Sequence, residues 1–164
     1  MVQNSEPRRR GRPRAYDPEL ALRDARDAFW KAGYAATSLD ELSAAMSMNR
    51  PSLYAAFGDK RALYLATLER YRDEARAQLA ERLSGARPLG EELRGLYAFA
   101  LASYLAGPEP RGCFLIGTAV TEANGDPEVR AVLAAALGEI EAAFAARFRL
   151  AREHGEVAQE ADPA

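Results

Sequence analysis

The chain has 164 residues, of which 48% are hydrophobic and 28% charged, and it carries a formal net charge of −2. No uninterrupted apolar run approaches the roughly 18 residues that a membrane-spanning helix needs, so the composition is that of an ordinary globular protein with no membrane partner. The charged N-terminus is followed by no apolar segment of the kind found in secretory signals, so we expect a cytoplasmic protein.

The charge is distributed unevenly along the chain. Residues 1–61 contain 11 Lys and Arg against 8 Asp and Glu, whereas residues 62–164 contain 11 against 16. Such asymmetry indicates a small part that faces nucleic acid and an acidic remainder with another task. Five arginines gather in RRRGRPR at residues 8–14. This run alone fits a solubilising tail, a targeting signal or a nucleic-acid-binding arm.

Apolar residues recur at helical spacing through most of the chain, and no strand-like alternation is present, so we predict an all-α fold. Predicted N-caps are Asp17, Ser38, Asn49, Asp59 and Asp126. Ser38 and Glu41 have the spacing of a capping box. The predicted helices cover about 18–33, 39–46, 50–57, 60–83, 89–106, 113–123 and 127–154.

The arrangement of these helices predicts two functional parts. Two short helices joined by about four residues, after a longer one, are typical of a helix-turn-helix unit. The helix over 89–106 is apolar around most of its circumference, which predicts burial on more than one side. The last helix is rich in alanine, which permits close approach of another helix.

No catalytic or metal site is evident, so we expect neither an enzyme nor a cofactor. His154 is the only histidine and lies near a helix end with no nucleophile at a meaningful spacing. Cys113 is the only cysteine, so an internal disulfide is impossible. A thiol that opens a helix beside Arg111 could be reactive, which makes a redox sensor one alternative; a buried inert cysteine is the other.

Three cations at predicted helix starts point to an anion. Arg50 begins the third helix, and Lys60 and Arg61 begin the fourth. Cations are disfavoured at helix N-termini, where the dipole is already positive, but backbone N–H groups and a nearby cation together bind phosphate. The alternative is that these side chains are simply solvated.

The segment GYAATSLDELSAAMSMNRPSLYAAFGDKRAL, residues 33–63, resembles the DNA-binding domain of the TetR family of bacterial transcriptional regulators. The shared features are the Gly-Tyr before the capping box, the Ser-Leu-Tyr of the third helix and the Phe-Gly-Asp-Lys junction. GCFLIGTAVTEANGDPEVRA is similar, less specifically, to the effector domain of one branch. The resemblance implies a helix-turn-helix domain over 15–61 and a helical effector-binding and dimerisation domain over 62–164.

The resemblance also implies which residues contact DNA. Arg50 would be the main base reader, because Arg pairs bidentately with guanine for about 1–3 kcal/mol of discrimination. Thr37 and Lys60 would hold backbone phosphates. The expected contacts in this domain are Thr37, Asn49, Arg50, Pro51, Ser52, Tyr54, Ala55 and Lys60. The expected core residues are Leu39, Leu42, Met48, Leu53 and Phe57.

Two positions depart from the family pattern. Ser47 stands where a glycine is usual in the turn, so it must adopt the turn conformation at some strain. Ala55 and Ala56 stand where many relatives have polar side chains. This shrinks the base-reading surface and places more weight on Arg50.

Attached to a helix-turn-helix domain, the basic run is interpreted as an N-terminal arm. Arg10-Gly11-Arg12-Pro13 has the form of an AT-hook core, which lays arginines into a narrow A·T-rich minor groove. Arg10, Arg12 and Arg14 are therefore expected DNA contacts. The alternative is a tail over 1–14 that adds only non-specific attraction.

By the same resemblance, the second domain binds a small-molecule effector of unknown identity and forms a homodimer. The expected lining of the effector pocket is Tyr71, Tyr97, Leu101, Tyr104, Phe114, Thr118, Thr121, Glu122 and Phe148. Asp162-Pro163 resembles a helix start, so we expect the chain to lack a final helix of the family. The alternative is that the dimer uses mainly residues 126–153.

These features predict a ligand-responsive, dimeric repressor that leaves a palindromic operator when a small molecule binds. The alternatives are an architectural protein of the A·T-rich minor groove and a regulator that senses oxidants through Cys113.

Overall fold

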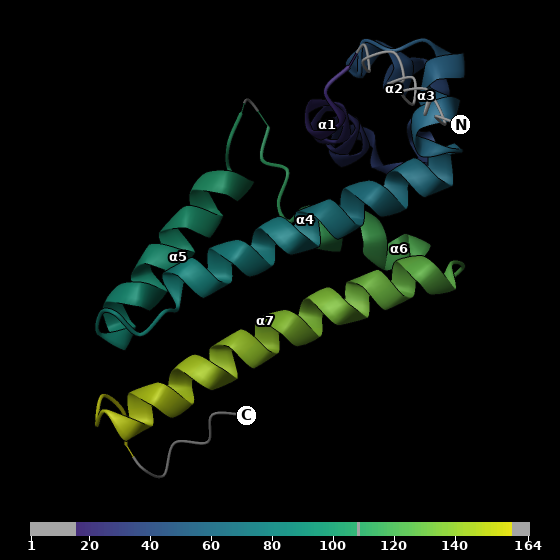
Figure 1. Cartoon of the computed structure of the whole chain (residues 1–164). Coiled ribbons are helices and arrows are strands. Elements are labelled where there is room, and N and C mark those ends of the chain that lie inside the picture. The colour runs from purple at the N-terminus through teal and green to yellow at the C-terminus, as the bar shows by residue number, and fades with distance from the viewer. Residues whose placement is uncertain (1–15, 108, 159–164) are drawn as a thin grey trace, which may run out of the picture.

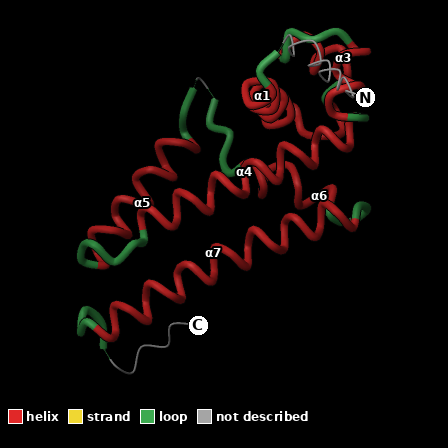
Figure 2. Tube along the Cα trace, viewed as in Figure 1, coloured by secondary structure: helices red, strands yellow, loops and turns green. Residues whose placement is uncertain are grey.

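The computed structural model describes residues 16–107 and 109–158, and every regular element in these ranges is helical (Figures 1 and 2). The predicted all-α fold is confirmed for this part of the chain. The arginines of the expected arm and the expected final helix start at Asp162 lie outside the described residues. Within the described ranges, no helix combines the length and the apolar character needed to cross a membrane.

The N-terminal unit consists of α1 (Pro18–Ala36), α2 (Leu39–Ala45) and α3 (Arg50–Phe57). Each predicted N-cap is confirmed: Asp17, Ser38 and Asn49 all accept hydrogen bonds from backbone N–H groups of the first turn. Ser38 and Glu41 complete the predicted capping box in both directions. These caps fix where α2 and α3 begin, and so fix the turn between them.

A long helix, α4 (Lys60–Arg82), leaves this unit and runs the length of the molecule beside α7 (Pro127–Glu153) (Figure 1). Ion pairs join Arg61 to Asp126 near the two helix starts and Arg72 to Glu139 near the middle. The two helices therefore run parallel. Between them in the chain are α5 (Leu89–Tyr104), η1 (Leu115–Ala119) and α6 (Val120–Glu122).

One hydrophobic core passes from the N-terminal helices into the second half of the chain. Phe29 of α1, Tyr64 of α4 and Phe114 before η1 are all fully buried, with ring centroids 5.0 Å apart for Phe29 and Tyr64 and 6.4 Å apart for Tyr64 and Phe114. The Tyr64 hydroxyl donates to Thr118 Oγ1 at 2.9 Å, which satisfies both buried groups. The two halves are thus packed on shared aromatic side chains.

Three sequence expectations about the helices need correction. The first helix is broken rather than ended at Gly33 (φ 78°) and resumes to Ala36. The predicted helix over 113–123 is mainly a π-helical segment, η1, because its hydrogen bonds run over a wider turn. The expected burial of α5 on several sides is wrong for this chain: Tyr97 is 60% exposed and Leu101 56%.

Ser47 adopts the predicted turn conformation, with a φ of 50°. This is the left-handed region, which a residue with a Cβ occupies at an energetic cost. The N–H of Met48 donates to the carbonyl of Ser43 at 3.0 Å across this turn. The turn between α2 and α3 is therefore closed by backbone hydrogen bonds despite the strain at Ser47.

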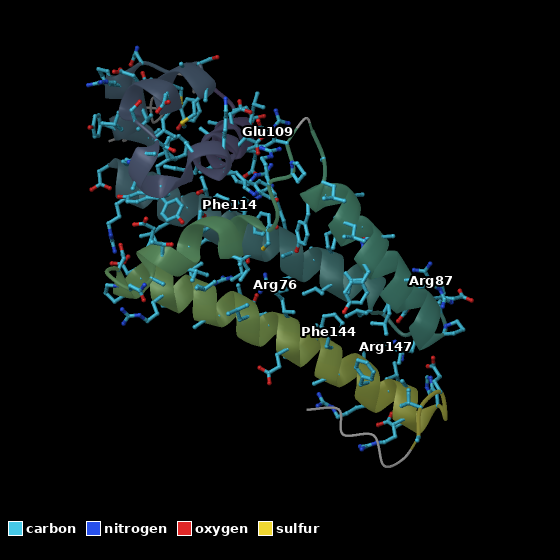
Figure 3. The ribbon with its side chains drawn as sticks, turned by 180° about the vertical axis from the view of Figure 1, so that it is seen from behind. Arg76, Arg87, Glu109, Phe114, Phe144 and Arg147 are labelled. Atoms are coloured by element: carbon cyan, nitrogen blue, oxygen red, sulfur yellow. The ribbon has the colours of Figure 1, made fainter. Side chains whose placement is uncertain are left out.

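A buried ion pair at the far end of the molecule was not foreseen from the sequence. Arg147 of α7 donates from Nε to Glu92 Oε2 of α5 at 2.6 Å, and both side chains are almost completely buried. Arg147 also contacts Glu156 at 3.1 Å. Figure 3 labels Arg147 on α7 near the beginning of α5. This network holds the start of α5 against the end of α7.

Candidate nucleic-acid interface and adjoining cavity

The third helix presents one buried and one exposed face. Leu53 is fully buried, and Ala56 and Phe57 are half-buried against the core. The expected core residues Leu42 and Met48 are also buried, and Leu39 packs partly buried against them. The other face is free: Asn49, Arg50, Pro51, Ser52, Tyr54 and Ala55 are all exposed. A surface of this kind can enter a major groove without disturbing the core.

Arg50 is held from the side by a carboxylate of α2. Its Nε donates to Asp40 Oδ1 at 3.0 Å, and its Nη2 lies 2.7 Å from Asp40 Oδ2. The Arg50 side chain remains 53% exposed and that of Asp40 77%. Arg50, the predicted base reader, is therefore accessible to solvent, but one edge of its guanidinium is already paired with Asp40.

Lys60, at the start of α4, lies over the ring of Tyr34 with its Nζ 4.6 Å from the ring centroid. The same Nζ donates to the carbonyl of Ala35 at 3.4 Å. These contacts orient the ammonium toward the end of α1 and the entry to α2. A phosphate at that edge of the unit would lie within its reach.

Two residues expected near an anion have protein partners in this structure. The Thr37 side chain is buried, and its hydroxyl donates to the carbonyl of Gly33 at 2.6 Å, so it caps α1 instead of facing a phosphate. Arg61 is paired with acidic groups of α7: its Nη2 lies 2.8 Å from Asp126 Oδ1 and 3.1 Å from Glu128 Oε1. Its role is to join α4 to the start of α7.

A cavity of about 730 Å³ lies between α1, α4, α5 and α7. Four of the expected effector-pocket residues line it, namely Tyr71, Tyr97, Leu101 and Tyr104. Tyr97, Phe99 and Leu101 are the exposed large apolar residues of α5, and all three line this cavity, which opens to solvent. A volume of this size suits a small organic molecule.

The other expected lining residues do not reach this cavity. Phe114 is fully buried behind the wall, 5.5 Å from the Tyr71 ring. Thr118 is buried, and its hydroxyl donates to the Phe114 carbonyl at 2.8 Å. Thr121 and Glu122 lie on α6, away from the lining. Phe148 does not line the cavity, and Phe144, one turn earlier on α7, lines it instead. Figure 3 labels Phe144 and the buried Phe114.

The sequence interpretation missed the contribution of α1 to the cavity. Arg26 and Trp30 of α1 line it, together with Arg111 from the segment after α5. The Trp30 indole N–H donates to the Arg111 carbonyl at 3.1 Å, and the Arg111 guanidinium lies 4.9 Å from the Trp30 ring centroid. The single tryptophan was the available signal, because a ring of that size is rarely placed without a packing or binding role.

Cys113 lies beside two tyrosines of the cavity wall. The Tyr71 hydroxyl donates to Cys113 Sγ at 3.9 Å, and Cys113 is half-buried. Burial raises the pKa of Tyr71, and the nearby thiol raises it further; the pKa of Tyr104 is raised by the same two causes. Both hydroxyls are protonated at neutral pH, and the single proton of the Tyr71 hydroxyl is already donated to Cys113 Sγ.

Comparison with known sequences identifies the two parts of the chain. Residues 21–67 match the family model described as bacterial regulatory proteins, tetR family, and residues 90–164 match the Tetracyclin repressor-like C-terminal domain. The HTH-type transcriptional repressor ComR of Escherichia coli is 37% identical over 113 residues, which are 68% of this chain and 54% of that repressor. YezE, an HTH-type transcriptional regulator of Bacillus subtilis, is 28% identical over 90% of this chain and 76% of its own.

Solved structures agree with these matches. The regulator CifR, a cysteine mutant complexed with 26-bp double-strand operator DNA, shares 37% identity with a TM-score of 0.78, covering 93% of this chain and 80% of its own. NemR of Escherichia coli, in its reduced form, has the same TM-score at 20% identity over 88% of this chain and 76% of its own, which shows a shared fold. The chain belongs to the TetR family of bacterial transcriptional regulators.

Proposed function

We propose that this protein is a dimeric repressor that binds a palindromic operator through α3 and leaves it when a small molecule enters the cavity. The observation that carries the proposal is the exposed face of α3, on which Arg50 and Tyr54 are accessible while Leu53 is anchored in the core. Arg50 would read a guanine, and Ser52, Tyr54 and Lys60 would hold phosphates or base methyl groups. The basic arm would add contacts in the minor groove.

The effector would act through α4, which carries both the cavity wall and the edge of the DNA-facing unit. Tyr71 and Glu74 of α4 line the cavity, and Lys60 begins the same helix beside the DNA-facing surface. A ligand that binds better to one orientation of α4 shifts the population toward that orientation, and operator affinity changes accordingly. The lining is mostly apolar and includes three tyrosines together with charged side chains such as Arg26, Glu74 and Arg111, which suits an aromatic or lipophilic molecule that also carries a polar group.

The dimer would form on the outer faces of α7 and the η1–α6 segment. Leu137 is 46% exposed on α7, and Ile116 and Val120 are 53% and 46% exposed. Binding to adjacent half-sites of a palindrome requires the two recognition helices of the dimer to lie about 34–36 Å apart, one turn of DNA. Sedimentation of a Leu137→Glu variant tests this: we expect a monomer, whereas an unchanged mass would contradict the proposed face.

A second candidate function is the sensing of oxidants or electrophiles through Cys113. The observation that favours it is the contact of the thiol with Tyr71 at the cavity wall, where a modification would push directly on α4. Oxidant-induced release from DNA should then disappear in Cys113→Ser. Intact release in that variant would dispose of this candidate and leave the effector proposal untouched.

The first experiment is selection of DNA from a random pool with the full chain and with Arg50→Ala. We expect a palindrome whose selectivity collapses in the variant. Recovery of only A·T-rich sequences, unchanged by the substitution, would contradict the proposal and favour an architectural minor-groove protein.

A further inference from the structure

We infer that Asp40 is a positioning residue for base recognition, because it fixes the Arg50 guanidinium by one edge and leaves the other edge for guanine. This inference rests on the proposed function, in which Arg50 reads a base. Asp40 itself would contact no DNA. Its effect on operator recognition would pass entirely through Arg50.

The geometry of the pair divides the guanidinium into a used and an available edge. Asp40 takes Nε at 3.0 Å and one side of Nη2 at 2.7 Å, and Arg50 has no other partner among the described residues. The edge formed by Nη1 and the second hydrogen of Nη2 therefore points away from Asp40. That edge supplies two parallel donors, which is what the O6 and N7 acceptors of guanine require.

The placement of Asp40 is otherwise unfavourable for a DNA-binding surface. Its side chain is 77% exposed on the first turn of α2, ten residues before Arg50. A carboxylate here repels phosphates, and an exposed ion pair adds little to stability. The start of α2 is already capped by Ser38 and Glu41, so Asp40 is not needed for the cap. Holding Arg50 accounts for a charge that would otherwise weaken DNA binding.

Orientation of Arg50 matters more here than on a surface with several base readers. Ala55 follows the exposed Tyr54 and offers only a methyl group, so few polar side chains on α3 can read bases. Arg50 has a long and flexible side chain that would lose rotamer freedom when it binds. A carboxylate that restricts the side chain beforehand reduces that loss and selects one approach to the base.

The test is a double-mutant cycle on operator discrimination. The proteins are the full chain, Asp40→Asn, Arg50→Ala and the double variant, with Asp24→Asn as the control for removal of one negative charge. Asp24 is matched because it lies in the same unit and contacts an arginine, Arg23, at 3.4 Å. Fluorescence anisotropy measures the affinity of each protein for three duplexes of equal length. The first is the selected operator, and the second is the same operator with another base at the guanine whose selection is lost in Arg50→Ala. The third is an unrelated sequence.

We expect Asp40→Asn to reduce discrimination at that guanine about fivefold, within the range that one bidentate arginine contact provides. The same substitution should leave discrimination unchanged when Arg50 is already alanine. Affinity for the unrelated duplex should rise in Asp40→Asn and in Asp24→Asn alike, because each removes a repulsive charge.

Two results would overturn the inference while the proposed function stands. One is unchanged discrimination in Asp40→Asn with affinity raised equally for all three duplexes, which would make Asp40 a repulsive surface charge only. The other is improved discrimination, which would mean that Asp40 competes with DNA for Arg50. If Arg50→Ala itself leaves discrimination intact, the base-reading role of Arg50 fails, and the inference fails with it.

Discussion

Glu92 and Arg147 form an ion pair whose side chains are 0% and 1% exposed. Burial raises the pKa of Glu92, but hydrogen bonds from Arg147 and from the N–H of Arg87 outweigh it and hold the pKa below its ordinary value. The contribution of Glu92 to stability is therefore present above its unfolded pKa and is lost as the pH falls through the lower folded pKa. At neutral pH the pair is fully charged.

We expect Glu92→Gln to lower the free energy of unfolding by about 3 kcal/mol at pH 7, because it leaves the buried Arg147 charge only partly compensated by Glu156. Urea unfolding at pH 7 and at pH 4 measures this, and the difference from the unchanged chain should narrow at the lower pH. Glu91→Gln, on the exposed neighbouring position, is the control and should change stability by less than about 0.5 kcal/mol. An equal loss of unfolding free energy in Glu91→Gln and Glu92→Gln would contradict a stabilising role for the buried ion pair.

At the scale of elements, α4 and α7 are joined where both begin. Asp126 has two tasks there: it caps α7 by accepting from the N–H groups of Glu128 and Val129, and it pairs with Arg61 of α4. The hydrogen bond from Arg61 lowers the pKa of Asp126 to about 2. The Arg61–Asp126 ion pair is thus charged at neutral pH, and its contribution to stability is lost only as the pH falls from about 4 toward 2.

We expect Asp126→Asn to separate these two tasks, because Asn caps a helix about as well as Asp but cannot form the ion pair. Helix content by circular dichroism should stay unchanged, while the Tm should fall at pH 7 and approach that of the unchanged chain as the pH is lowered toward 3. A difference in Tm that persists unchanged at low pH would contradict the role of the charge. Asp73→Asn, which removes a more exposed carboxylate that lies beside Arg72 and Arg76, is the control.

At the scale of the whole molecule, the overall charge of −2 conceals a basic N-terminal part. The five arginines of residues 8–14 precede the helix-turn-helix unit directly. Each arginine that neutralises a phosphate releases a counterion, which makes binding weaker as salt rises. The arm is therefore proposed to supply much of the salt dependence of DNA binding.

We expect deletion of residues 1–14 to weaken operator binding and to flatten the plot of log Kd against log salt by up to about 0.9 for each phosphate that an arginine of the arm neutralises. Binding titrations at several salt concentrations measure the slope. A full-length variant in which the five arginines are replaced by glutamine is the control, because it removes the charge of the arm without shortening the chain. An unchanged slope in both variants would refute a DNA-binding arm.

The sequence by itself determined the approximate positions of the helices, the predicted N-caps and the family. Caps depend on residues close in the chain, so Ser38 with Glu41 and Asn49 before α3 could be predicted from local chemistry. The strain at Ser47 followed from the family resemblance, because related chains have glycine at that position. The motif around Arg50 identified the DNA-facing helix for the same reason: its residues are contiguous. The exposed and buried faces of α3 followed from the family resemblance of this motif, which assigns Arg50 and Tyr54 to the DNA side and Leu53 to the core.

Only the tertiary structure decided which distant residues meet. Arg61 pairs with Asp126 because α4 and α7 begin side by side, and no local pattern carries that information. The same holds for Trp30 in the cavity wall and for the Glu92–Arg147 pair, whose partners are 55 residues apart. By its chemistry, a side chain of this kind could contact a ligand, a phosphate or a neighbouring helix. The packing between helices decides which of these it contacts, and the local sequence does not specify that packing.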